Sequence, residues 1–279
     1  SLLLFGSDAG ALTGFGSQFL LFGGMATIVF GAIGVLATQS MGRLASYNLL
    51  VSSGTLLAAI GMGDAAVISG ALFYLVSSTL TVSALFLLIE LVERAQEPGA
   101  NLLTVTMEAY GDEVDAEGDE EQEVGLIMPG ALAIVGVCFG CIGLLLAGFP
   151  PLSGFIAKFA LLAAMFNPDG LGGEAGIGGP TWVFAALVIL SGLAALISLL
   201  RTGIRTFWAP VEAVMPRVLV VEAAPIIVLI VACVVLTVQG APLLRYTDAA
   251  AQSLHMPASY IDRVLPPSAS GNETGEIER

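Results

Sequence analysis

One ionisable side chain stands out as able to do chemistry, the amine of Lys158 in the apolar stretch "FPPLSGFIAKFALL" (residues 149–162). It is the sole lysine of the 279 residues, and no acidic residue lies between Val124 and Asp169. A lysine near the centre of a membrane helix costs about 2.5–3.5 kcal/mol on insertion scales, and such groups usually face an interior path. Removal from water disfavours the charged amine, so that it can take up and release a proton near neutral pH. We therefore expect Lys158 to act as a proton acceptor and donor.

The residues just before this lysine predict a break in its helix: Gly148, Pro150, Pro151 and Gly154. Proline lacks an N–H and clashes with the carbonyl four residues back, so two in succession break a helix. The second half should then begin afresh, with the prolines near its first turn and Ser153 as its cap. Broken backbone at membrane depth is tolerated where protein buries it or a wet cavity hydrates it, and transporters build ion sites there. A purely structural kink is the alternative interpretation.

The composition indicates a membrane protein built only from helices. The chain is 56% hydrophobic and 11% charged, with a mean hydropathy of +0.92, whereas a soluble domain carries about 25% charged residues. About 20 apolar residues cross a hydrocarbon core. Six segments of this kind form a polytopic transmembrane domain within 1–240, at about 11–37, 44–62, 65–92, 129–166 (broken near 149–151), 181–208 and 218–239.

Two segments differ from this apolar domain. Residues 94–127 are expected to form a disordered acidic loop, because 108–123 alone hold nine of the 23 acidic residues and repel one another. Attraction of cations to a membrane mouth is the alternative role for this loop. The tail, 241–279, is expected to be an amphipathic surface helix followed by a disordered end.

The arginines predict the orientation. Loops one and three carry Arg43 and Arg94, and the end of the fifth span together with loop five carries Arg201, Arg205 and Arg217, whereas loops two and four carry no Lys or Arg. Cytoplasmic loops are rich in these residues. The acidic loop should therefore be cytoplasmic and the tail outside, although the tail holds three arginines of its own.

These motifs resemble one family of membrane proteins. "GFPPLSGFIAKFALL" is similar to the G-x-P-P-L-S-G-F-x-x-K signature of the antiporter-like subunits of respiratory complex I and of the multisubunit (Mrp-type) monovalent cation/proton antiporters. "GRLASYNLLVSSGTLLAAIG" (42–61) resembles the family's K-R-L-L-A-Y-S-S-I-S-H-x-G helix, and 71–88 resembles its next helix. The acidic stretch and the tail resemble the D subunit of the Mrp-type antiporters.

The resemblance implies the second inverted repeat of these subunits plus a final helix, in a bacterial cell (inner) membrane. It implies that the protein exchanges protons for Na⁺ or K⁺ and that Lys158 carries the proton. The expected partners are other small membrane subunits and lipid. Neither nucleic acid nor a cofactor is expected. Candidate path or ion contacts are Arg43, Tyr47, Ser52, Ser77, Ser78, Glu90 and Glu222. Where the family has lysines or histidines, this chain has Gly42, Ser52, Ser77, Ser78 and Val82. Few ionisable side chains therefore remain to carry protons along the membrane. Without the first repeat, this chain alone is not expected to transport.

Other interpretations stay open. A proton-pumping subunit of complex I is the alternative function, against which the acidic loop and the tail argue, and a truncated non-transporting scaffold is a third. Glu90 and Arg94 are four apart, as in an ordinary surface pair. Glu222 can hold a cation or lie at the interface. No metal site is expected, because neither His255 nor the Cys138-x-x-Cys141 pair has the further ligands that one needs.

Overall fold

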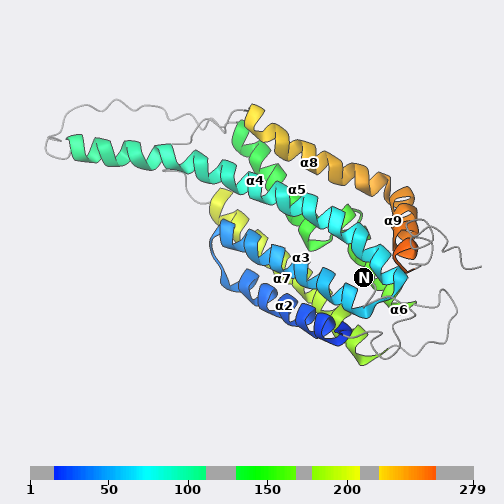
Figure 1. Ribbon diagram of the computed structural model, residues 1–279. Coiled ribbons are helices and arrows are strands. Elements are labelled where there is room, and N and C mark those ends of the chain that lie inside the picture. The colour runs from blue at the N-terminus through cyan, green and yellow to red at the C-terminus, as the bar shows by residue number, and fades with distance from the viewer. Residues whose placement is uncertain (1–15, 111–129, 168–177, 208–219, 256–279) are drawn as a thin grey trace, which may run out of the picture.

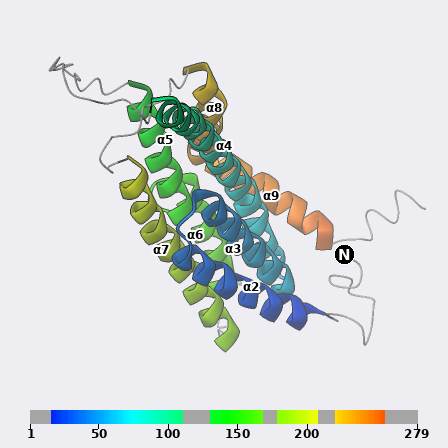
Figure 2. The same cartoon turned by 90° about the vertical axis from the view of Figure 1, so that its left-hand side faces the viewer.

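The described part of the protein is entirely helical. The computed structural model describes residues 16–110, 130–167, 178–207 and 220–255. Its helices are α2 (Ser17–Ala37), α3 (Met41–Met62), α4 (Ala65–Tyr110), α5 (Gly130–Ala147), α6 (Ser153–Phe166), α7 (Gly179–Phe207), α8 (Val220–Val238) and α9 (Gly240–His255). They form an elongated bundle with α9 at one end (Figures 1 and 2). The expected all-α class is confirmed.

The lengths of the helices fit a membrane. Among the described residues four helices are long and apolar enough to cross one: α2, α3, the Ala65–Arg94 part of α4, and Gly179–Thr206 of α7. The shorter apolar helices α5 and α6 follow one another along the bundle (Figures 1 and 2). Helices α8 and α9 meet at a bend of 81°. The six apolar segments of the sequence thus correspond to α2, α3, α4, the α5–α6 pair, α7 and α8.

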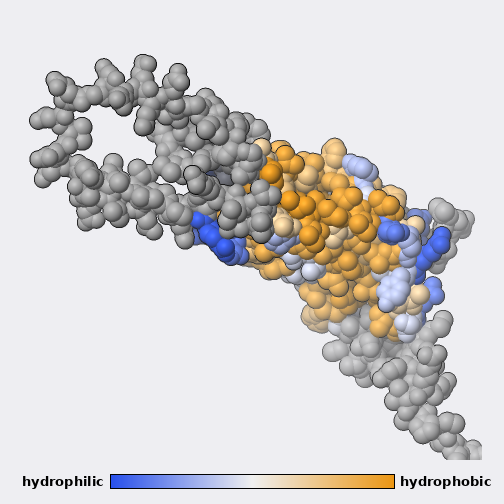
Figure 3. Space-filling model, turned by 90° about the horizontal axis from the view of Figure 1, so that it is seen from above, coloured by the Kyte–Doolittle hydropathy of each residue, from blue (hydrophilic) through white to orange (hydrophobic). Residues whose placement is uncertain are grey.

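Much of the outer surface is apolar. Phe19, Phe30 and Ile189 are 81%, 62% and 62% exposed. Figure 3 shows apolar residues covering the middle of one face, with hydrophilic residues at its two ends. An apolar surface of this extent is unusual for a soluble monomer and is typical of contact with lipid or with other membrane proteins.

Helix α4 continues further than the sequence predicts. We expected the third span to end near residue 92 and a disordered loop to begin at 94, but the helix runs to Tyr110 and projects beyond the bundle (Figure 1). The loop boundary was therefore wrong. Residues 94–110 contain Pro98 and Gly99, which disfavour helix, but residues that favour helix lie on both sides of them, and extending an existing helix needs no new nucleus. Residues 111–127 of the expected loop lie outside the described residues.

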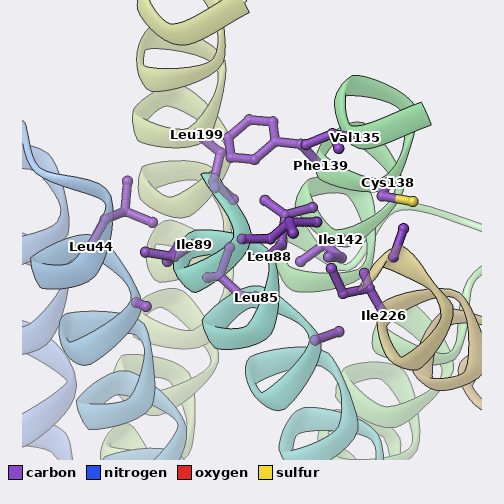
Figure 4. Close-up of a cluster of buried hydrophobic side chains, with 14 residues drawn as sticks. Leu44, Leu85, Leu88, Ile89, Val135, Cys138, Phe139, Ile142, Leu199 and Ile226 are labelled. Atoms are coloured by element: carbon purple, nitrogen blue, oxygen red, sulfur yellow. The ribbon is translucent and has the colours of Figure 1, made fainter. Parts of the chain in front are cut away.

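A buried apolar cluster fixes the helices around α4. Figure 4 shows Leu85, Leu88 and Ile89 of α4 between side chains of α3, α5, α7 and α8. Leu88 of α4 and Ile142 of α5 are completely buried. On another face of α4, a Cβ at Gly70 would lie 2.8 Å from the Cα of Leu161, so α6 is in backbone contact with α4. Helix α4 is therefore the support against which both halves of the broken helix are positioned.

The end of α7 caps the end of α2. The Arg201 guanidinium donates hydrogen bonds to the carbonyl oxygens of Leu36 (2.9 Å) and Thr38 (2.7 Å), and the Ser198 hydroxyl donates to that of Val35 (2.7 Å). The last carbonyls of a helix have no partner within it. Arg201, one of the arginines from which the sequence predicts the orientation, thus satisfies carbonyls of another helix.

We predict that Arg201→Ala lowers the free energy of unfolding by about 1–2 kcal/mol, because it removes two charge-assisted hydrogen bonds of a partly exposed side chain. Thermal unfolding in detergent measures this. The matched control is Arg205→Ala, which removes one bond to the side chain of Gln39 and should have a smaller effect. Equal melting temperatures for the two variants would contradict the capping role.

Helix α9 is attached to the ends of α3 and α4. Thr247 is within hydrogen-bond distance of Ser69 (3.1 Å), and Nε2 of His255 lies 3.0 Å from the carbonyl oxygen of Gly63. Leu243 and Leu244 pack against a buried group formed by Phe73, Tyr74 and Ala157. This group adjoins Lys158 in the sequence, so α9 closes the bundle beside the candidate site.

Candidate functional site

The helix break has a defined hydrogen-bond geometry. Helix α5 ends at Ala147, and Gly148 follows in the left-handed conformation (φ 78°) that favours glycine. The Phe149 amide donates to the Leu144 carbonyl (3.0 Å) and the Gly148 amide to the Leu145 carbonyl (3.2 Å), as in a Schellman motif. The Pro150–Pro151 peptide, which is cis, lies in the connection to α6. The break thus begins directly after Ala147, and it leaves the carbonyls of Leu146 and Ala147 outside this motif.

The expected cap of α6 was wrong. The N-cap is Leu152, whose backbone is extended, and no side chain caps the helix there. Ser153 is already the first helical residue, so its hydroxyl is not at the capping position. Instead it accepts a hydrogen bond from the Ser77 hydroxyl of α4 (3.2 Å).

Lys158 turns back towards the break. Its Nζ donates hydrogen bonds to the carbonyl oxygens of Leu146 (3.0 Å) and Ala147 (3.1 Å), the two that the Schellman motif leaves free. The C-terminal end of a helix carries partial negative charge and stabilises a cation. The break and the lysine therefore form one unit, in which the ammonium group completes the hydrogen bonding of α5.

Three glycines allow this unit to close. A Cβ at Gly192 of α7 would lie 3.0 Å from Nζ of Lys158 and 2.8 Å from the carbonyl oxygen of Ala147. A Cβ at Gly148 would lie 3.0 Å from Cδ of Lys158. A Cβ at Gly154 would collide with the carbonyl oxygen of Leu145. The backbones of α5, α6 and α7 thus approach around the amine more closely than any larger residue permits.

A small cavity, in which polar side chains lie among a mainly apolar lining, is found beside the amine. Its volume of about 30 Å³ has room for about two water molecules. Polar side chains come from α3, α4, α6 and α7: Asn48, Ser52, Tyr74, Ser77, Ser78, Thr81, Lys158 and Ser191. Hydroxyl groups both donate and accept hydrogen bonds, so such a cavity can hold water in contact with a proton-carrying amine.

The structure brings some of the predicted site residues together. Lys158, Ser52, Ser77 and Ser78 line the cavity, as does Gly154. The residues that carry the prediction thus come from three helices, α3, α4 and α6.

Other predicted contacts lie elsewhere. Arg43 is exposed, and the ring of Tyr47 packs edge-to-face with Phe30 (centroids 6.1 Å apart) on α2. Glu90 forms an exposed ion pair with Arg94, with 63% and 64% of the two side chains accessible. Neither Arg43, Tyr47 nor Glu90 lines the cavity. The side chain of Glu222 lies outside the described residues.

Sequence reasoning missed Asn48, Tyr74, Thr81, Ser191 and Gly192. A signal was available for three of them. Asn48 stands four residues before Ser52, and Tyr74, Ser77, Ser78 and Thr81 recur at helical spacing in otherwise apolar helices, so each set falls on one face. Gly192 carries no comparable signal, because its importance comes from its neighbours on α5 and α6.

The comparison with known families decides the classification. The family model described as "NADH:quinone oxidoreductase/Mrp antiporter, TM" matches residues 3–171, more than half of the chain and all of the broken helix. The chain belongs to this family. It is therefore a multi-pass membrane protein, and the resemblance seen in the motifs is confirmed.

Curated relatives of this family member include antiporter subunits. It is 54% identical over 272 residues to the D subunit of a probable K(+)/H(+) antiporter of Rhizobium meliloti, covering 98% of this chain and 50% of the relative. It is 29% identical over 260 residues to the D subunit of an Na(+)/H(+) antiporter of Bacillus subtilis. This match covers 91% of this chain and 45% of the relative. The chain spans about half the length of these relatives.

Solved structures of the family share its fold. A chain of the Mrp complex from Dietzia sp. matches 90% of this chain and 50% of its own length, with a TM-score of 0.66 and 19% identity. A chain of respiratory complex I from Thermus thermophilus matches 84% of this chain and 46% of its own length, with a TM-score of 0.52 and 17% identity. The expected antiporter-like subunit fold is confirmed.

Proposed function

We propose that the chain belongs to the D subunit of a multisubunit antiporter that exchanges protons for K⁺ or Na⁺. The single observation that carries the proposal is the amine of Lys158, held at a helix break beside a cavity that polar side chains help to line. The names of the relatives support it. In this proposal the protein is a secondary transporter subunit and not an enzyme.

Lys158 is the proton carrier in this mechanism. The charged amine rests on the carbonyls of Leu146 and Ala147, and loss of its proton weakens both hydrogen bonds. Water in the cavity and the hydroxyls of Ser77, Ser78 and Thr81 can accept the proton, because each group both donates and accepts. These hydroxyls and the water transmit the proton, and no second charged residue comes from the described part of the cavity wall.

The proposed setting is a bacterial inner membrane, with other small membrane subunits as partners. The outward-facing apolar side chains of the bundle support contact with lipid or with such subunits. The Mrp complex from Dietzia sp., which contains a chain of the same fold, supports a hetero-oligomeric assembly.

A proton-pumping role in complex I is the second candidate, since its subunits share the family. The greater likeness to antiporter subunits favours exchange.

The test is transport in everted vesicles from a host that lacks its own antiporters and carries the complete gene set. We expect a respiration-driven pH gradient to collapse when KCl or NaCl is added, but not when choline chloride is added. If the protein is instead a complex I subunit, we expect no collapse of the pH gradient on cation addition. The gradient should then require NADH oxidation by the complex that contains the protein. Which salt acts identifies the cation.

The arginine distribution predicts that the acidic loop is cytoplasmic and the tail outside. In single-cysteine variants of the full complex, a membrane-impermeant maleimide should label Ser270→Cys in intact cells and Glu117→Cys only after the membrane is opened. Labelling of Glu117→Cys in intact cells would reverse the topology.

A further inference from the structure

We propose that the carbonyl oxygens of Leu146 and Ala147, which hold the Lys158 ammonium group, are also ligands of the exchanged monovalent cation. The cation and the Lys158 ammonium group compete for this place, because both need the same two oxygens. The inference rests on the proposed function and specifies how proton and cation are coupled within it.

The two oxygens suit a small cation. They lie 3.0 and 3.1 Å from a unit positive charge, at the C-terminal end of α5, where the helix dipole is negative. Backbone carbonyls replace the hydration shell of K⁺ in selective channels, and the C-terminal ends of half-helices coordinate Na⁺ in transporters. An ammonium group and an alkali cation therefore satisfy these oxygens by the same electrostatics.

The site has room for further ligands. The adjoining cavity is lined by the hydroxyl-bearing residues Ser77, Ser78 and Thr81, and it has room for about two water molecules. Gly192 leaves open the side that faces α7, where a Cβ would be 2.8 Å from the Ala147 oxygen and 3.0 Å from Nζ. A cation that leaves its hydration shell can thus gain oxygens from backbone, side chains and water.

The lysine and the cation exclude one another. Among the described residues that line the cavity, the titratable side chains are Lys158 of α6 and the phenol of Tyr74 from α4, and no carboxylate there offsets a second positive charge. Two cations cannot share one pair of oxygens without strong repulsion. The exchange is therefore Lys158–NH₃⁺ + K⁺ → Lys158–NH₂ + bound K⁺ + H⁺, which balances atoms and charge. Competition for the same oxygens makes the stoichiometry at this site one proton for one cation.

The experiment measures proton release and cation binding together, in the purified full complex without a membrane gradient. KCl, with choline chloride as the control at equal ionic strength, is added to a weakly buffered sample with a pH indicator, and ⁸⁶Rb⁺ reports binding. We expect K⁺ but not choline to release protons. The Kd for ⁸⁶Rb⁺ should rise by up to tenfold for each pH unit below the titration of the lysine.

Two variants locate the competition. Lys158→Met should bind ⁸⁶Rb⁺ with a Kd that no longer depends on pH, and K⁺ should release no proton from it. Gly192→Ala should raise the Kd at least tenfold, because its Cβ crowds the Ala147 oxygen. Gly143→Ala, whose Cβ would make only ordinary contacts of 3.7 Å or more with Leu199, is the matched control and should change nothing.

Binding without proton release in the wild type, or pH-dependent binding in Lys158→Met, would overturn the inference. So would an unchanged Kd in a folded Gly192→Ala variant. If that variant does not fold, the pH dependence in the wild type and in Lys158→Met still decides. The proposed function is tested by a different experiment: it is rejected if wild-type vesicles show no cation-dependent exchange. Exchange in vesicles without competition at Lys158 would leave the function standing and reject this site.

Discussion

Lys158→Ala should abolish cation-dependent proton exchange while the protein still assembles into its complex. Alanine has no group that accepts a proton. It also leaves the carbonyls of Leu146 and Ala147 accessible to water in the neighbouring cavity, so the loss of stability should be small. The measurement is dequenching of a pH-sensitive dye in everted vesicles after K⁺ or Na⁺ addition, with the amount of the variant protein in the membrane quantified by immunoblot.

Lys158→Arg provides a sharper comparison. Arginine retains the positive charge and hydrogen-bond donors for the two carbonyls, but it does not give up its proton in proteins. We therefore expect assembly without exchange. Wild-type exchange rates in an assembled Lys158→Ala variant would show that the lysine has a structural role, and wild-type rates in Lys158→Arg would exclude a proton cycle on this side chain.

Gly154→Ala should be the most destabilising single methyl addition at the break. Its Cβ would collide with the carbonyl oxygen of Leu145, a backbone atom that cannot rotate away, so α6 must move from the end of α5. Overpacking of this kind costs about 1–3 kcal/mol, and we expect the upper end of that range. The displaced helix also carries Lys158, so exchange should fall together with the melting temperature in detergent.

Gly140→Ala is the control for this prediction. It adds the same methyl group to α5, where no atom lies within 4 Å of the new Cβ. Because alanine favours helix over glycine by about 1 kcal/mol, its melting temperature should be unchanged or slightly raised. A Gly154→Ala variant as stable as Gly140→Ala would show that the two half-helices are not in backbone contact.

Some of the site could be predicted because its signals are local. A proline pair breaks a helix wherever it occurs in one, and Lys158 is conspicuous against its apolar neighbours. Ser52, Ser77 and Ser78 were predicted from the family's pattern and do line the cavity. Tyr47, from the same pattern, packs on α2 instead, because the rotation of α3 about its axis decides which of its residues face the site.

The sequence alone determined that this is a polytopic helical membrane protein with a break before Lys158. It could do so because hydropathy and the effect of proline on a helix both act within a few residues. Tertiary structure alone decided where the amine points. Its hydrogen bonds to Leu146 and Ala147, the room left by Gly192, and the docking of α9 through Thr247 and His255 join residues up to 192 positions apart. Such contacts depend on how side-chain ridges and backbones of different helices interlock, and no pattern within one helix contains that information.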